Sequence, residues 1–78
     1  MNTFRLTKSS DIRAVRLRVI EEYGHGTNVA PASHDEILEW RLDDETVIRE
    51  GRDPDGSFYW TCTGKEPKFF SDLVLEYS

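Results

Sequence analysis

The chain has 78 residues, a mass of 9.1 kDa and a formal net charge of −5. This length allows one small core, so we expect a single compact domain over residues 1–78 and no deep substrate cavity. The single cysteine excludes an intramolecular disulfide, and no apolar run reaches the roughly 18 residues of a membrane span. The N-terminus lacks the apolar segment of a signal peptide, so the expected location is the cytoplasm, without membrane contact.

The first elements expected along the chain are a strand and a helix. Residues 4–7 alternate apolar and polar side chains, as a short half-buried strand does. A serine cap at residue 9 or 10, Asp11 in the first turn and Gly24 after the last periodic position favour a helix up to Tyr23. Within it, residues 13–20 also fit the period of a strand, and that alternative stays open. A loop is expected over residues 24–32.

A second, short helix is expected from His34 to about Leu42. The residues Ser33-His34-Asp35-Glu36 match a capping box, in which the serine and the glutamate each satisfy one free amide at a helix start. Apolar residues at spacings of three and four support the helix, and Trp40 is expected at its rim.

The remaining residues predict a three-stranded meander. Strands are expected at 46–50, 57–63 and 69–77, and Asp53-Pro54-Asp55-Gly56 predicts the turn that joins the first two. The resulting element order is β-α-α-β-β-β. The fold class is therefore α+β, a two-layer sandwich in which two helices cover an antiparallel sheet of three or four strands. Whether residues 4–7 join this sheet stays open.

The usual patterns of catalytic and metal sites are missing from the sequence. Asp53-x-Asp55-Gly56 has part of a calcium loop, but Pro54 intervenes and no glutamate stands at the twelfth position. His25, His34 and Cys62 lack the paired spacing of a zinc site. Cys62 is expected on the core side of a strand, without an activating base. We therefore expect no metal, no cofactor and no enzymatic activity.

One family resemblance covers roughly 25 residues. The residues Phe4-Arg5-Leu6, Ser10-Asp11-Ile12 and Arg16-Leu17-Arg18 resemble the opening strand and helix of GNAT acetyltransferases. Glu21-Glu22-Tyr23-Gly24-His25-Gly26 is similar to their Q/R-x-x-G-x-G/A pyrophosphate loop. Here, however, the loop follows a helix, its first position is acidic and would repel a pyrophosphate, and the chain has about half the needed length. We interpret the resemblance as convergence on a common strand-helix pattern.

The charges are unevenly distributed along the chain. Residues 1–20 carry five bases and one acid, whereas residues 21–78 carry five bases and fourteen acids. Arg13, Arg16 and Arg18 form a possible basic patch on the first helix, and a nucleic-acid-binding domain is the third-ranked hypothesis for function. The acidic net charge opposes it, and the alternative is that these arginines pair with acids of the same fold or of a second subunit.

The acidic majority favours a protein partner with a basic surface, because long-range attraction steers such partners together. Small acidic domains without catalytic residues are typical of phage-encoded inhibitors, including anti-CRISPR proteins and other nucleic-acid mimics. The leading hypothesis is therefore an inhibitor of a nucleic-acid-handling protein. The alternative is a housekeeping adaptor or a homodimer that uses an open sheet edge. The predicted partner-binding residues are Glu39, Trp40, Asp43, Asp44, Glu45, Glu50, Asp53, Asp55 and Tyr59.

Overall fold

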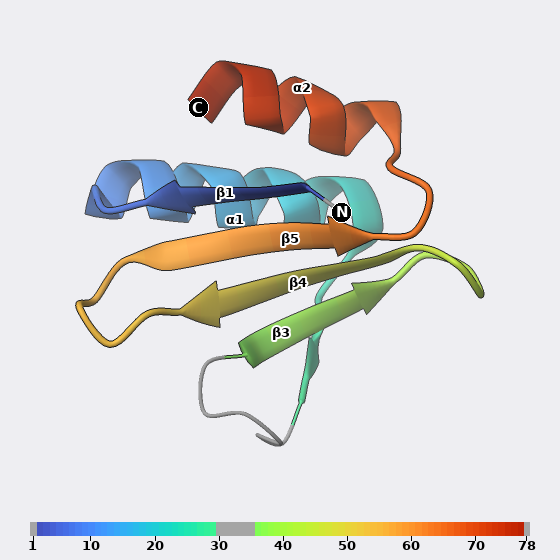
Figure 1. The fold of residues 1–78 in the computed structure, drawn as a ribbon, viewed down its shortest axis with the longest axis horizontal. Helices are drawn as coiled ribbons and strands as arrows, with labels where there is room; N and C mark the ends of the chain where they lie inside the picture. The colour runs from blue at the N-terminus through green and yellow to red at the C-terminus, as the bar shows by residue number, and fades with distance from the viewer. Residues whose placement is uncertain (1, 30–35, 78) are drawn as a thin grey trace.

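The computed structural model of the protein describes residues 2–29 and 36–77. They form an α+β fold with one antiparallel sheet in the order β1-β5-β4-β3-β2 (Figure 1). The elements in chain order are β1 (Asn2–Leu6), α1 (Ser9–Tyr23), β2 (Thr27–Asn28), β3 (Glu36–Arg41), β4 (Val47–Arg52), β5 (Phe58–Thr63) and α2 (Lys68–Tyr77).

Three of the expected elements are confirmed. The N-terminal strand exists as β1, and it joins the sheet as the edge strand beside β5. Residues 13–20 are helical within α1, and Gly24 caps its C-terminal end with a positive φ of 85°. The expected serine cap is wrong, because Lys8 is the N-cap and makes no side-chain hydrogen bond there. The hairpin β4–β5 is present, and the amide of Asp53 donates to the carbonyl of Ser57 (2.8 Å) across its turn.

The expected second helix at 34–42 is wrong, because residues 36–41 form β3. Leu38 and Trp40 share one face of this strand with the core, whereas Glu39 and Arg41 point to the other face. This period of two is that of a strand, and pairing with β4 stabilises it along its length. The first three residues of the expected capping box, 33–35, lie outside the described residues.

The expected last strand at 69–77 is also wrong, because residues 68–77 form the helix α2. Phe70 and Leu73 are fully buried, and Phe69, Val74 and Tyr77 are half-buried against the same core. Their spacing fits one side of a helix, and the exposed Leu75 (80%) faces away. The observed order is therefore β-α-β-β-β-β-α, and the sheet has five strands instead of the expected three or four.

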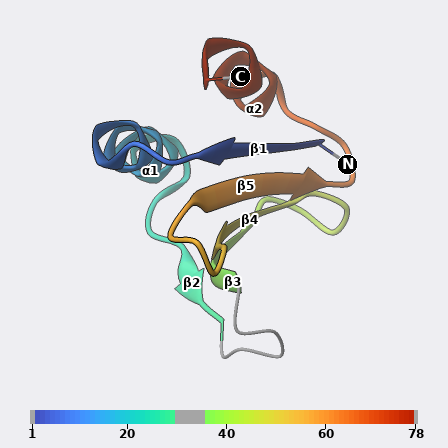
Figure 2. The same ribbon diagram turned by 60° about the vertical axis from the view of Figure 1, so that its left-hand side comes forward.

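The core lies on one face of the sheet, with both helices near β1 (Figures 1 and 2). Helix α1 contacts β1, and α2 runs along the same edge strand. The stacked rings of Phe4 and Trp60 (5.5 Å between centroids) join β1 to β5 inside this core. The buried cluster contains Phe4, Leu6, Ile12, Val15, Val19, Trp40, Ile48, Trp60, Cys62, Phe70 and Leu73.

Among the residues whose side chains are described, the other face of the sheet contributes none to this cluster. Arg5 and Tyr59 are register partners on it, and the guanidinium carbon of Arg5 lies 5.6 Å from the centre of the Tyr59 ring. Arg49 stands beside Glu39 in the register of β3 and β4. We call this side the open face.

Candidate protein-binding surface

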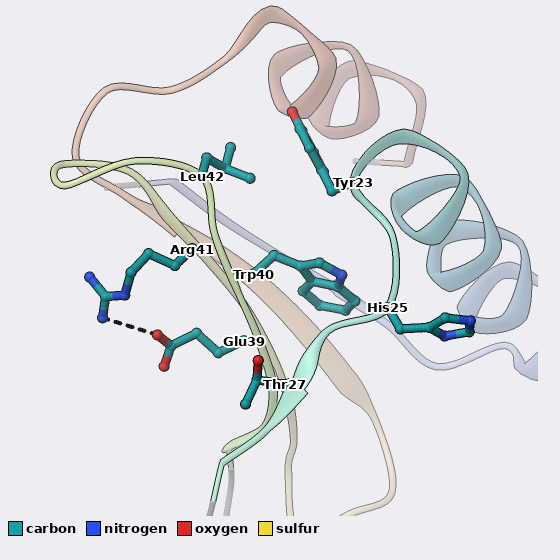
Figure 3. Close-up of a pocket in the computed structure, with 7 residues that line it drawn as sticks. All are labelled: Tyr23, His25, Thr27, Glu39, Trp40, Arg41 and Leu42. Atoms are coloured by element: carbon teal, nitrogen blue, oxygen red, sulfur yellow. Dashed lines mark hydrogen bonds and ion pairs between the residues drawn. The ribbon is translucent and has the colours of Figure 1, made fainter.

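A cleft opens at the outer edge of β3, where the two-residue strand β2 begins (Figure 3). Its volume is about 190 Å³, which suits a single side chain better than a whole metabolite. Seven residues from α1, the following loop, β2, β3 and the position after β3 line it: Tyr23, His25, Thr27, Glu39, Trp40, Arg41 and Leu42.

Trp40 belongs to the inner part of this cleft and to the core. Its side chain is only 4% exposed, and its Nε1 donates to the carbonyl oxygen of Gly24 (2.9 Å). Gly26 packs directly on the indole, since a Cβ there would lie 2.8 Å from Cε2 of Trp40. The expectation that Trp40 is an exposed anchor at the rim is wrong, because β3 turns the ring inward. It instead holds the Gly24–Gly26 loop in place.

Tyr23 and Leu42 border the upper part of the cleft (Figure 3). The ring of Tyr23 packs edge-on against Phe69 of α2, with centroids 5.4 Å apart. Burial raises the pKa of the Tyr23 hydroxyl, and the neighbouring carboxylate of Glu22 raises it further. The side chain of Tyr23 is therefore a neutral, partly apolar wall close to a negative charge.

Glu39 lines the cleft, and its side chain lies on the open face of the sheet. Its carboxylate accepts from Nη2 of Arg41 (3.1 Å) and forms an ion pair with Nε of Arg49 (3.5 Å). Two cations therefore neutralise this predicted contact acid within the fold, which leaves it little charge to offer to a partner.

The loop between β3 and β4 follows directly after Leu42 and exposes three acids. The Oδ1 of Asp43 accepts from the amides of Glu45 (2.8 Å) and Thr46 (2.7 Å), and these bonds lower the pKa of its carboxyl. Asp43 therefore has a structural role as the side chain that closes the turn. The side chains of Asp44 and Glu45 have no hydrogen bond or ion pair in the described part of the chain.

The other predicted contact acids do not continue this loop. Glu50 has a fully buried side chain on the helix-covered face and pairs with Arg16, so its predicted exposure is wrong. Asp53 accepts from Arg5 (3.1 Å) and from Ser57. Asp55 accepts from the amide and the hydroxyl of Ser57, which lowers its pKa. Both lie in the β4–β5 turn, at the opposite end of β4 from Asp43 (Figure 1). The acids of residues 39–55 are thus split between two ends of the sheet.

Two of the three arginines in the predicted basic patch form ion pairs within the fold. Arg16 forms two hydrogen bonds with Glu50, and Arg18 pairs with Glu76 of α2. Pairing with acids of the same fold, which was one of the alternatives, is confirmed for these two residues. Only Arg13 of the three is exposed without an ion pair in residues 2–29 and 36–77.

Sequence reasoning missed two acids that directly precede Tyr23, a residue that lines the cleft. Glu21 and Glu22 precede Tyr23 in the last turn of α1, are exposed, and have no ion pair among the described residues. Acids at this position oppose the helix dipole, whose C-terminal end is negative. That unfavourable position was the sequence signal that could have identified them.

The described residues show no arrangement typical of a catalytic or metal site. They contain no group of three or more histidine, cysteine or acidic side chains that could hold a metal ion. Cys62 is 1% exposed, and burial raises the pKa of its thiol. No helix in the described ranges is long and apolar enough to cross a membrane. Comparisons with protein-family models, curated proteins and solved structures find no match to this chain.

Proposed function

We propose that the protein is a non-enzymatic binding module that inhibits a nucleic-acid-handling protein by covering a basic surface on it. One observation carries the proposal. Four exposed carboxylates without ion pairs in the described ranges, those of Glu21, Glu22, Asp44 and Glu45, stand beside residues that line one cleft. Glu39 and the acids of the β4–β5 turn are engaged by cations or by turn amides, so these four supply the free negative charge.

The cleft supports recognition of an arginine or lysine side chain. The aliphatic part of such a side chain can pack against Tyr23 and Leu42, while the exposed acids that flank these two residues in the sequence attract its charge. The aromatic face of Tyr23 adds attraction for a cation. Because these four carboxylates are exposed and unneutralised, they also speed the encounter with a basic partner, and this effect declines as salt increases.

The experiment compares two double variants with identical charge. Asp44→Lys/Glu45→Lys and Asp72→Lys/Glu76→Lys each change the net charge from −5 to −1. The second pair lies on α2 and loses only exposed ion pairs, which contribute about 0–1 kcal/mol each. Asp43 is left intact because it closes the turn. The wild type and both variants are immobilised, incubated with cell lysate, and the retained proteins are identified by mass spectrometry.

The wild type and the α2 variant should retain the same nucleic-acid-binding proteins, and Asp44→Lys/Glu45→Lys should retain about tenfold less of them. Added DNA or RNA at constant ionic strength should release the retained proteins, as expected for occupation of a phosphate-binding surface. The proposal is wrong if the two variants lose binding equally, since net charge alone would then explain it. It is also wrong if nucleic acid fails to compete.

A further inference from the structure

A second pocket lies at the other end of α1, between the first turns of this helix and the start of β5. Its volume is about 220 Å³, and Ser9, Ile12, Arg13, Arg16 and Phe58 line it. Figure 1 shows the start of α1 and the start of β5 at the same end of the molecule, opposite the β3–β4 loop. The pocket is large enough for several water molecules or for one small polyatomic anion.

The guanidinium of Arg16 is held in a fixed orientation within this pocket. Its Nε and Nη2 donate to the two carboxylate oxygens of Glu50, each at 3.0 Å. The Glu50 side chain is fully buried, and the Phe58 ring centre lies 5.5 Å from the Arg16 guanidinium carbon. The remaining nitrogen, Nη1, has no hydrogen-bond partner in the described part of the chain. Since Arg16 lines the pocket and is 37% exposed, Nη1 can donate to a ligand there.

Two further donors stand on the same side of the helix. Ser9, Arg13 and Arg16 are separated by four and three residues, which places them one above the other along α1. Arg13 has no ion pair and the Ser9 hydroxyl has no hydrogen bond within residues 2–29 and 36–77. Asp11, the acid of the first turn, lies on a different side of the helix because each residue advances the chain by about 100°.

A third arginine adds to the positive charge next to the pocket. Arg52 is the register partner of Phe58, is exposed, and has no ion pair among the residues described. Arg13, Arg16 and Arg52 together carry three positive charges, and Glu50 compensates one of them. The nearby acids of the β4–β5 turn are engaged, Asp53 by Arg5 and Ser57, and Asp55 by Ser57. The carboxylate of Asp55 keeps its charge when the neutral Ser57 donates to it, so these arginines exceed the nearby acids by one positive charge, in a chain with a net charge of −5.

We propose that this pocket binds the phosphate group of a small phosphate monoester. The guanidinium groups of Arg13 and Arg52 have no ion pair among the described residues and attract an anion, and arginine donors fit the oxygen geometry of phosphate. Arg13, Arg16 Nη1 and the Ser9 hydroxyl bind the phosphate oxygens, while Ile12 and Phe58 contact the organic part. Glu50 is a positioning residue, because it fixes the guanidinium of Arg16 without reaching the ligand. The site is separate from the acidic cleft, so either proposal can fail alone.

The test is a titration of the ¹⁵N-labelled protein, followed by NMR. The probes are inorganic phosphate and phenyl phosphate, with ionic strength held constant by sodium chloride. Both should cause saturable shifts of the Arg16 Nε–Hε signal and of amides near Ser9 and Phe58. Inorganic phosphate should bind with a dissociation constant in the millimolar range, and phenyl phosphate several times more tightly through Phe58 and Ile12.

Arg13→Gln is the test variant, because the exposed Arg13 has no role in the core and the variant should fold. It should weaken phosphate binding about tenfold. Arg41→Gln removes the same charge from an exposed arginine of the open face, and should change the affinity by less than about twofold. Equal losses in the two variants, or shifts that do not saturate, would overturn the site. Phenyl phosphate that binds no more tightly than inorganic phosphate would overturn the assignment to a monoester.

Discussion

The two ends of α1 differ in sign and in how far the fold neutralises them. Near the start of the helix, Arg16 meets the buried Glu50, and Arg13 and Arg52 have no ion pair among the described residues. At its last turn, Glu21 and Glu22 are exposed, and the helix has no base there. Tyr23 of this turn and Leu42 line the same cleft, and the exposed acids Asp44 and Glu45 follow Leu42 in the chain. The comparison shows that an ion pair within the fold accounts for part of the positive charge at the start of α1. The four acids at the other end form no ion pair within the described structure, so folding does not account for them.

The largest effect is expected from the buried ion pair at the basic end. Arg16→Ala leaves the Glu50 carboxylate buried without a partner and should lower the free energy of unfolding by about 3 kcal/mol. Arg18→Ala, two residues along the same helix, breaks a pair with Glu76 whose side chains are 37% and 54% exposed, and should cost less than about 1 kcal/mol. Urea denaturation of both variants gives the two values. Equal values would show that the burial of Glu50 does not distinguish the two ion pairs.

A smaller effect of opposite sign is expected at the acidic end. Glu21→Lys/Glu22→Lys should raise the free energy of unfolding by about 0.5–1 kcal/mol, because cations are favourable at a helix C-terminus. The control, Asp44→Lys/Glu45→Lys, makes the same change of net charge in a loop and reports the general relief of repulsion. Thermal melts at low ionic strength compare the two. If the helix variant gains no more than the loop variant, the helix dipole is not the cause.

The smallest effect concerns the turn acids at the two ends of β4. Hydrogen bonds hold the pKa of Asp43 and of Asp55 below the ordinary value of 3.8. Such carboxylates stabilise the folded state fully above that ordinary value, and this contribution is lost as the pH falls through their lower folded values. Asparagine keeps an acceptor oxygen without titrating. The wild type should therefore lose more stability than Asp43→Asn/Asp55→Asn between pH 5 and about pH 2.5, measured by urea denaturation. Parallel losses would contradict this prediction.

Local sequence signals predicted β1, α1 and the β4–β5 hairpin, because the alternation in β1, Gly24 after α1 and the turn residues of the hairpin are features of neighbouring residues. The errors fall where two periods compete. Leu38, Trp40 and Leu42 alternate with Glu39 and Arg41 as in a strand, but the capping-box pattern before them favoured a helix. In α2, Phe69, Leu73 and Tyr77 fit both a strand and a helix, and the adjacent buried Phe70 shows that the helical period holds.

The sequence predicted less of the candidate binding surfaces than of the fold. The sequence predicts Asp43, Asp44 and Glu45 alike as partner contacts, but Asp43 closes the β3–β4 turn and only Asp44 and Glu45 remain exposed without a bond of their side chains in the described residues. Sequence reasoning could not distinguish these exposed acids from the buried Glu50. Glu50 is buried as an ion pair with Arg16, which lies 34 residues away in the chain. The phosphate pocket joins Ser9 and Arg13 to Phe58, and no local pattern relates these segments.

By itself, the sequence determined the acidic character of the chain, its α+β class, the first helix and the hairpin turn, since these depend on composition and on neighbouring residues. The tertiary structure alone decided that residues 36–41 are a strand, that residues 68–77 are a helix, and which charges are left without partners. The physical reason is that pairing with β4 and burial against the shared core outweigh weak local preferences. Whether a charge is free depends on which distant side chain the fold brings to it.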